Sequence, residues 1–216
     1  MWPPRRDGVD KVKDLDKALA EITAIRSQMA KGAEFRGYGP ATVAATGIVA
    51  LVAAAFQGFW LPHPADDVPG FVTIWVVVAA VSVALVGIEM VARSRRIHSG
   101  LADEMIQAAI GELVPAAVAG LLTTVILFHF APQSLWMLPG LWQIMFSLGV
   151  FASCHLLPRA IFAAGAWYLL AGLASLALAR EARAFSPLAM GLPFGLGQML
   201  IAAILHRSFG ERDGAP

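Results

Sequence analysis

Two glutamine side chains in uncharged, apolar stretches are the groups of this chain best placed to contact a ligand. Gln143 ends the segment LPGLWQ, and Gln198 ends the segment LPFGLGQ. Proline and glycine interrupt helical hydrogen bonding, and such interruptions at matching places in membrane spans indicate binding sites in transporters. Two deep tryptophans could wall an apolar pocket beside these amides. The candidate ligand-binding residues are therefore Trp75, Trp142, Gln143, Pro193, Gly195 and Gln198.

The same residues have a structural interpretation that the sequence leaves open. Glycine lets helix backbones approach closely, and an amide within a membrane must find a partner on a neighbouring helix or on a ligand. Tryptophan is enriched at membrane interfaces. Under this interpretation Gln143 and Gln198 link helices, the run 191–197 is a packing surface, and the two tryptophans belong to an aromatic belt and to the core.

The loop LPHPADDV carries imidazole and carboxylate groups, which can bind a divalent metal. Its His63, Asp66 and Asp67 are expected to lie on the same side of the membrane as His129. No repeated ligand spacing supports a metal centre, and a short acidic loop is usually only solvated. The sequence therefore offers these four residues as metal ligands only as an alternative.

Histidines near the opposite side of the membrane could ligate haem if they faced one another across the bundle. The candidates are His98, Cys154, His155 and His206. They fall in a loop or at helix ends beside arginines, a position that favours contacts with lipid headgroups. No cofactor is therefore predicted, and metal or haem binding is kept as an alternative.

Enzymatic chemistry has little support in the sequence. The chain contains no Gly-x-Ser-x-Gly, no His-Glu-x-x-His and no phosphate-binding glycine loop. Ion-coupled transport usually relies on ionisable groups within the membrane. Within the apolar runs the only carboxylate is Glu89, which is expected to pair with Arg93. A non-enzymatic protein is therefore predicted.

These groups sit in a chain whose composition is that of a membrane protein. Of its 216 residues, 58% are hydrophobic and 14% are charged, and the mean hydropathy is +0.68. A soluble domain this apolar would expose large sticky patches. A span needs about 20 largely apolar residues, and six runs qualify: 40–62, 69–91, 114–131, 135–157, 160–179 and 187–206. We predict an all-α fold, a polytopic membrane bundle of six transmembrane helices.

Net charge, cysteine content and the N-terminal sequence exclude three further features. The net charge of +1 implies no nucleic-acid partner, and the lipid bilayer is the predicted surrounding. A single cysteine, Cys154, excludes an intramolecular disulfide. The N-terminus MWPPRRDGVDKVKD lacks the apolar core and cleavage site of a signal peptide, so the first span is expected to stay in the mature protein.

The distribution of lysine and arginine predicts the orientation in the membrane. The N-terminal segment, the loop after the second span and the tail 207–216 carry lysine or arginine, whereas the loops 61–68 and 132–134 contain none. Both termini are therefore expected in the cytoplasm, for a multi-pass protein of a bacterial-type inner membrane. Arg180 and Arg183 are the exception, because they fall on the outer side.

Prolines recur near the starts of the predicted spans. The segment PATVAA at 40–45 resembles PAAVAG at 115–120, and Pro69-Gly70 resembles Pro139-Gly140. One interpretation is a helical hairpin repeated three times. The alternative is that proline suits the first turn of any helix, where its missing N–H leaves nothing unsatisfied.

Residues 1–39 are predicted to form a cytoplasmic segment with an amphipathic helix over 10–31, because apolar residues recur there at steps of three and four. A second amphipathic helix is expected at about 99–113, and the two could pack together as a platform for a cytoplasmic protein. The bilayer surface and a second copy of the chain, as in a homo-oligomer, are the alternatives. The residues proposed to dock the partner are Leu15, Leu19 and Ile22.

The sequence thus favours a regulatory or accessory membrane component that senses a ligand or a membrane partner and contacts a cytoplasmic protein. The first alternative is a substrate-binding or facilitative transport component for a small apolar or aromatic-compatible solute. The second alternative is a metal- or haem-binding membrane protein.

Overall fold

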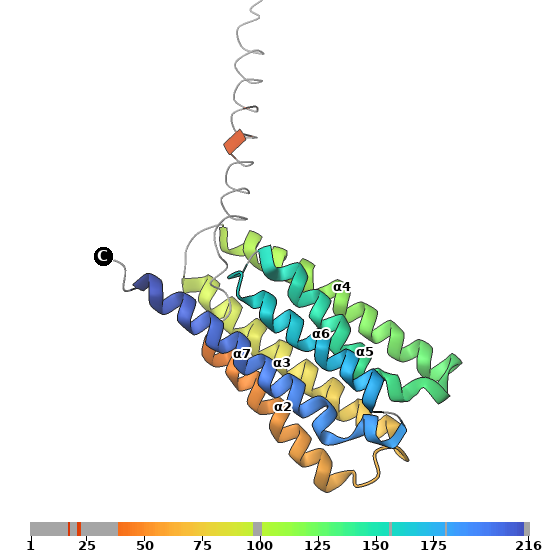
Figure 1. Cartoon of the computed structure of the whole chain (residues 1–216). Helices are drawn as coiled ribbons and strands as arrows, with labels where there is room; N and C mark the ends of the chain where they lie inside the picture. Colours follow the sequence, from red (N-terminus) through yellow and green to blue (C-terminus); the bar gives the residue numbers. More distant parts are fainter. Residues whose placement is uncertain are drawn as a thin grey trace, which may run out of the picture.

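The computed structural model describes residues 39–96, 101–155, 157–179 and 181–213, together with Lys17, Glu21 and Ile22. Within these residues the chain is all-helical, and six long helices run side by side (Figure 1). The long helices are α2 (Pro40–Trp60), α3 (Val68–Arg96), α4 (Leu101–Phe130), α5 (Leu138–Ala152), α6 (Ile161–Leu178) and α7 (Pro187–Asp213). Three short 3-10 helices accompany them, namely η1 (Pro132–Met137), η2 (Ser153–His155) and η3 (Glu181–Phe185).

Five apolar helical stretches in the described part are long enough to cross a membrane. They are Pro40–Trp60, Val68–Ala92, Pro132–Ala152, Ile161–Leu178 and Pro187–Ser208. The third predicted span corresponds to Val114–Phe130, which is apolar but shorter than the other five. The predicted all-α fold is therefore confirmed, and five of its helices are suited by length and composition to span a membrane.

The segment predicted as a separate loop helix at about 99–113 differs from the structure in one respect. It is helical, but it continues without a break into the following apolar stretch as α4, so that Pro115 lies inside a helix and not near its start. Proline removes only one helical hydrogen bond, to the carbonyl four residues earlier, and its ring crowds that carbonyl. That carbonyl belongs to Gly111. A Cβ added to Gly111 would meet nothing within 4 Å, so no neighbouring helix prevents a local adjustment of α4 at this point.

The other predicted proline positions agree with the structure. Pro40 and Pro187 are the first residues of α2 and α7, and Pro69 and Pro139 are the second residues of α3 and α5. Pro158 precedes α6, where its carbonyl accepts a hydrogen bond from the Ile161 N–H at 2.8 Å. Because any helix favours proline in its first turn, these positions alone do not require repeated hairpins.

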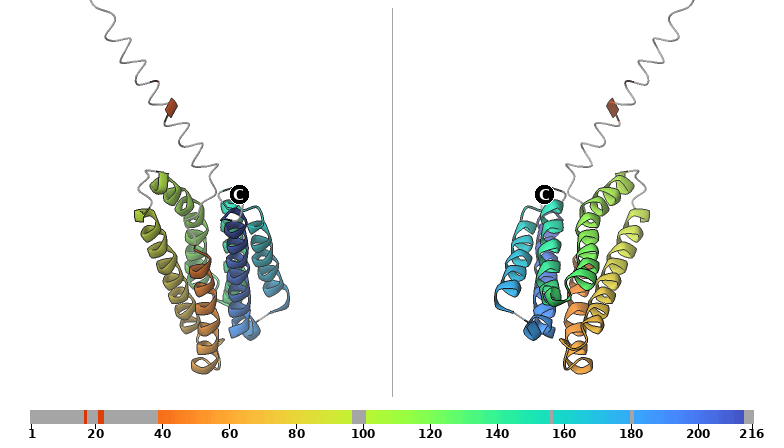
Figure 2. Two further views of the ribbon diagram at one scale, coloured as in Figure 1. Left: turned by 90° about the vertical axis from the view of Figure 1, so that its left-hand side faces the viewer. Right: turned by 90° about the vertical axis from the view of Figure 1, so that its right-hand side faces the viewer.

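The first and last described long helices, α2 and α7, pack against each other. The most extensive contacts are those of α2 with α7 and of α5 with α6, and further contacts join α4 to α5, α2 to α3 and α6 to α7. Helix α3 lies at an edge of the bundle in both views of Figure 2. Only 11% of its apolar window is buried, against 28–39% for the other four spans. Helix α3 is therefore the least buried of these five spans.

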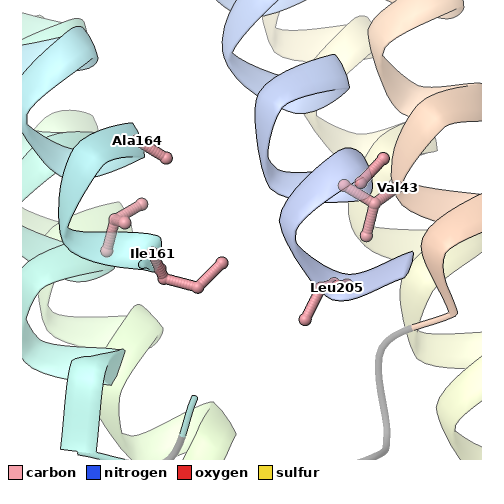
Figure 3. Close-up of a cluster of buried hydrophobic side chains, with 6 residues drawn as sticks. Val43, Ile161, Ala164 and Leu205 are labelled. Carbon is pink, nitrogen blue, oxygen red and sulfur yellow. The ribbon is translucent and has the colours of Figure 1, made fainter. Parts of the chain in front are cut away.

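Two hydrophobic clusters fill the two halves of the bundle. We call the end at residues 61–67, 131–137 and 181–186 the hairpin end, and the opposite end, which includes Gly39 and residues 157–160, the terminal end. In the terminal half, Ile161 and Ala164 of α6 point toward Leu205 of α7, with Val43 of α2 beside it (Figure 3). The cluster of the hairpin half consists of Ala50, Ala54, Phe71, Trp75, Phe185 and Met190.

Glycines set the close approach of the two main helix pairs. A Cβ added to Gly172 of α6 would lie 2.7 Å from the backbone oxygen of Gly140 in α5, and one added to Gly191 of α7 would collide with the Cβ of Ala54 in α2. Small residues allow such contacts between membrane helices, where van der Waals packing drives association. The predicted glycine packing surface therefore exists on α7, and a second lies between α5 and α6.

The carboxylate of Glu89 has a role at the terminal end. It accepts a hydrogen bond at 3.2 Å from the N–H of Gly39, the residue that precedes the first turn of α2 and has no side chain to cap that helix. A negative charge there is also attracted to the positive end of the helix dipole and stabilises α2. The side chain of Arg93, the expected partner of Glu89, lies outside the described part of the chain.

The predicted N-terminal helix is not tested, because Leu15 and Leu19 lie outside the described residues. Ile22 is described, is helical and is 48% exposed. The docking stripe therefore stays a prediction.

Candidate functional site

The sequence around Pro193 creates a local demand for a hydrogen-bond donor. Proline has no N–H, so the carbonyl of Ala189, four residues earlier in α7, loses its helical partner. In a membrane such a carbonyl must be satisfied by a neighbour. The Nε2 group of Gln143 on α5 donates to the Ala189 oxygen at 2.8 Å. Gln143 thus replaces the hydrogen bond that Pro193 removes, which explains an amide in so apolar a stretch.

Two aromatic side chains of α6 bond to carbonyls one turn further along α7, those of Pro193 and Phe194. The indole N–H of Trp167 donates to the oxygen of Pro193 at 2.9 Å, and the hydroxyl of Tyr168 lies 3.5 Å from the oxygen of Phe194. Helices α5 and α6 therefore both hold the proline-interrupted part of α7 through its backbone. Pro193 is part of this framework.

Gln57, near the hairpin end, forms hydrogen bonds through both atoms of its amide, and its side chain has no exposed surface. Its Nε2 group donates to the Phe185 oxygen at 2.8 Å, and its Oε1 atom accepts from the indole N–H of Trp75 at 2.8 Å. One amide thus joins α2, α3 and η3. Trp75 is 3% exposed and packs in the core of the hairpin half, so it does not wall an open pocket.

Gln57 was missed in the sequence, although the signal was of the same kind as for Gln143. An amide stands between Phe56 and Gly58 in an uncharged run. A place near the end of a predicted span does not by itself indicate burial. The tertiary structure instead covers that end with Phe185 and Trp75.

Trp142 forms a second indole link. Its N–H donates to Oγ1 of Thr124 at 3.0 Å, and the Thr124 hydroxyl donates to the Gly120 oxygen at 2.8 Å. The sequence also missed Thr124. Trp142 lies 18 residues after its partner, the same separation that joins Trp75 to Gln57. The hairpins α2–α3 and α4–α5 are therefore closed in the same way.

Gln198 and Gly195 lie in the contact between α7 and its neighbours. Gln198 is half-buried, and a Cβ added to Gly47 of α2 would lie 3.0 Å from its Cβ. A Cβ added to Gly195 would lie 2.6 Å from Leu51 of α2. These two candidates therefore pack helices together, as the structural interpretation expects.

One polar atom of the site has no partner. Gln143 has no exposed surface, and its Oε1 atom forms no hydrogen bond with any described residue. The amide orientation is set by the donation from Nε2 to the Ala189 oxygen. Of the six candidate ligand-binding residues, Gln143 is the one that keeps a buried group available for a further hydrogen bond.

The metal hypothesis is not supported by the geometry. Among the described residues, no group of three or more His, Cys, Asp or Glu side chains could hold a metal ion. Asp67 instead accepts the Gly70 N–H at 2.9 Å in the first turn of α3, and the His129 ring bonds to the Val125 oxygen at 3.0 Å. His63 and Asp66 are exposed in a turn closed by the backbone bond from Asp66 N–H to the His63 oxygen.

Only two of the four candidate haem ligands, Cys154 and His206, have described side chains. His98 and the side chain of His155 lie outside the described structure. His206 is exposed on α7. The thiol of Cys154 is engaged locally, with Sγ 3.4 Å from the Val150 oxygen. No described pair of these residues faces across the bundle.

The fold and these contacts define a helical membrane protein whose internal polar groups join its helices. Comparison with protein-family models, with curated proteins and with solved structures finds no match to the chain.

Replacing Gln143 with leucine should lower the free energy of unfolding by about 0.5–2 kcal/mol, the range of hydrogen bonds between membrane helices. The substitution leaves the Ala189 oxygen without a partner, but it also removes the unpartnered Oε1 atom. Thermal melting in detergent measures the change. Gln133→Leu at an exposed position of η1 is the control and should have no effect. An equal loss in both variants would contradict this role.

Proposed function

We propose that this protein is a non-enzymatic membrane component that acts as an accessory or regulatory partner of other proteins. The observation that supports this is the use of the internal polar side chains. Gln57, Trp75 and Trp142 each bond to another helix, so they serve as a framework. A bundle held in this way suits a protein that acts through its surfaces, such as the lipid-facing side of α3 and the N-terminal segment.

The proposal includes six spans, with Val114–Phe130 as the third, in a bacterial-type inner membrane. An even number of spans keeps both termini on one side, and the excess of lysine and arginine at the terminal end favours the cytoplasm for that side. In this arrangement the residues 61–67, 131–137 and 181–186 face outward.

Single cysteines introduced into a Cys154→Ala background should test the orientation. Cysteines at Asp66 and Arg183 should react from outside with a membrane-impermeant maleimide, because both exposed residues lie at the hairpin end. A cysteine at Arg159, exposed at the terminal end, should be protected in intact cells. Labelling only at position 159 would reverse the orientation, and protection of 183 together with labelling of 66 would contradict the placement of the last hairpin.

The functional proposal is tested by purification of the full chain from native membranes, followed by identification of the proteins that accompany it. Replacing Leu15, Leu19 and Ile22 with serine should release a cytoplasmic partner while the detergent-solubilised bundle keeps its melting temperature. Deletion of residues 1–32 should have the same effect. If both variants retain every accompanying protein and the full cellular phenotype, the regulatory proposal is wrong.

A second candidate function is a substrate-binding or facilitative transport component for a small apolar or aromatic-compatible solute. The unpartnered, fully buried Oε1 atom of Gln143 favours it, because a hydrogen-bond donor on a solute could satisfy that atom. A panel of small aromatic solutes should then raise the melting temperature of the wild type and not of Gln143→Leu. Uptake into vesicles containing the purified chain separates transport from binding.

A further inference from the structure

A groove runs between α6 and α7 on the outside of the bundle. Its volume is about 400 Å³. Ala171 and Ala174 of α6 form one wall, and Leu188, Leu192 and Leu196 of α7 form the other. Leu188 is 64% exposed, and both helices are long and apolar enough to cross a membrane. The groove therefore opens toward the bilayer and not into the core.

The two ends of the groove differ in chemistry. Trp167 lies at the deep end, with its indole N–H already bonded to the Pro193 oxygen at 2.9 Å. Ser175, Arg183 and Ser186 lie at the hairpin end. The helical rise between residues 167 and 179, the limits of the α6 wall, gives a length of roughly 18 Å. An apolar channel of this length, with polar groups at one end, has the form of an amphiphile.

The polar end presents unused donors. The Arg183 guanidinium is exposed and forms no ion pair with any described carboxylate. The Ser186 hydroxyl oxygen accepts the Ala189 N–H at 3.2 Å, which leaves its own hydrogen to donate. The Ser175 side chain forms no hydrogen bond with a described residue. One cation and two hydroxyl donors thus meet at the level where a lipid headgroup would lie.

The position of Arg183 is otherwise unexplained. The loops 61–67 and 131–137 at the hairpin end contain no lysine or arginine, and topology alone favours neutral residues on that side. A guanidinium is well suited to bind a phosphate through parallel hydrogen bonds.

We propose that the α6–α7 groove binds an anionic phospholipid, with its phosphate at Arg183, Ser175 and Ser186 and one acyl chain along Leu188, Leu192 and Leu196. Charge complementarity selects the anionic lipid over a zwitterionic one, because Arg183 is the one charged residue among the described residues that line the groove. The apolar wall selects a lipid over a free phosphate or a soluble anion.

The test uses the full chain reconstituted into phosphatidylcholine vesicles with a minor fraction of phosphatidylglycerol. Native mass spectrometry then identifies the lipid that stays bound after extraction. The wild type should retain phosphatidylglycerol in preference to phosphatidylcholine. Arg183→Gln should lower this retention about five-fold, the effect of one basic residue near anionic headgroups. Arg183→Lys should keep most of it, and Arg207→Gln, exposed in the C-terminal part of α7, should leave it unchanged.

A second variant tests the apolar wall independently of charge. Ala174→Phe should fill the groove and reduce the retained lipid, whereas Ala163→Phe, exposed near the start of α6, should not. Melting temperatures close to that of the wild type show that the variants are folded. The proposal is overturned if phosphatidylcholine is retained as well as phosphatidylglycerol, if Arg183→Gln binds like the wild type, or if the two alanine variants behave alike.

Discussion

Replacing Gly172 with alanine is expected to lower the free energy of unfolding by about 1–3 kcal/mol, the usual cost of overpacking a well-filled contact. The added Cβ would lie 2.7 Å from the backbone oxygen of Gly140 and 2.8 Å from the Ile144 side chain. Because a backbone atom cannot rotate away, α5 and α6 must separate, and contacts along the whole pair weaken. Reversible unfolding in mixed micelles, or thermal melting in detergent, measures this loss.

Gly87 of α3 is the matched control for that substitution. A Cβ added there would meet nothing within 4 Å. Gly87→Ala should therefore be neutral or stabilise the helix by up to about 1 kcal/mol, since alanine favours helix over glycine. Equal destabilisation by the two variants would show that the α5–α6 approach is not limited by Gly172.

Replacing Gln57 with leucine is expected to lower the free energy of unfolding by about 1–3 kcal/mol, more than the corresponding change at Gln143. It removes two hydrogen bonds and leaves two buried groups without partners, the indole N–H of Trp75 and the oxygen of Phe185. Gln143→Leu breaks one bond to an oxygen, at Ala189, and a weaker contact at 3.8 Å with the Sδ atom of Met190. The two leucine variants, melted side by side in the same detergent, give the comparison.

A double-mutant cycle with Trp75→Phe identifies the cause. Phenylalanine keeps most of the aromatic packing but removes the N–H, so the Gln57→Leu change should be less damaging in that background. Additive effects would show that the bond from Trp75 to Gln57 contributes no coupling. A smaller loss for Gln57→Leu than for Gln143→Leu would contradict the role of Gln57 as the link among α2, α3 and η3.

The class of protein and the positions of most helices are determined by the sequence itself. Lipid offers no hydrogen bonds to the backbone, so a run of about 20 apolar residues must be helical to cross it. Proline in a first turn marks where such a helix begins, as at Pro40 and Pro187. Pro115 shows the limit of this rule, because α4 begins at Leu101 and passes through it.

The partners of each helix are decided only by the tertiary structure. The amide of Gln57 reaches Phe185, 128 residues away, and that of Gln143 reaches Ala189, 46 residues away. Sequence reasoning could say that Gln143 needs a partner, but the carbonyl left open by Pro193 becomes that partner only when α5 packs beside α7. In the same way, His63 and His129 are exposed in a loop and at a helix end, and the packing of the described residues does not bring them into a group of metal ligands. Local chemistry determines which groups must be satisfied, and the packing of distant helices determines which group satisfies them.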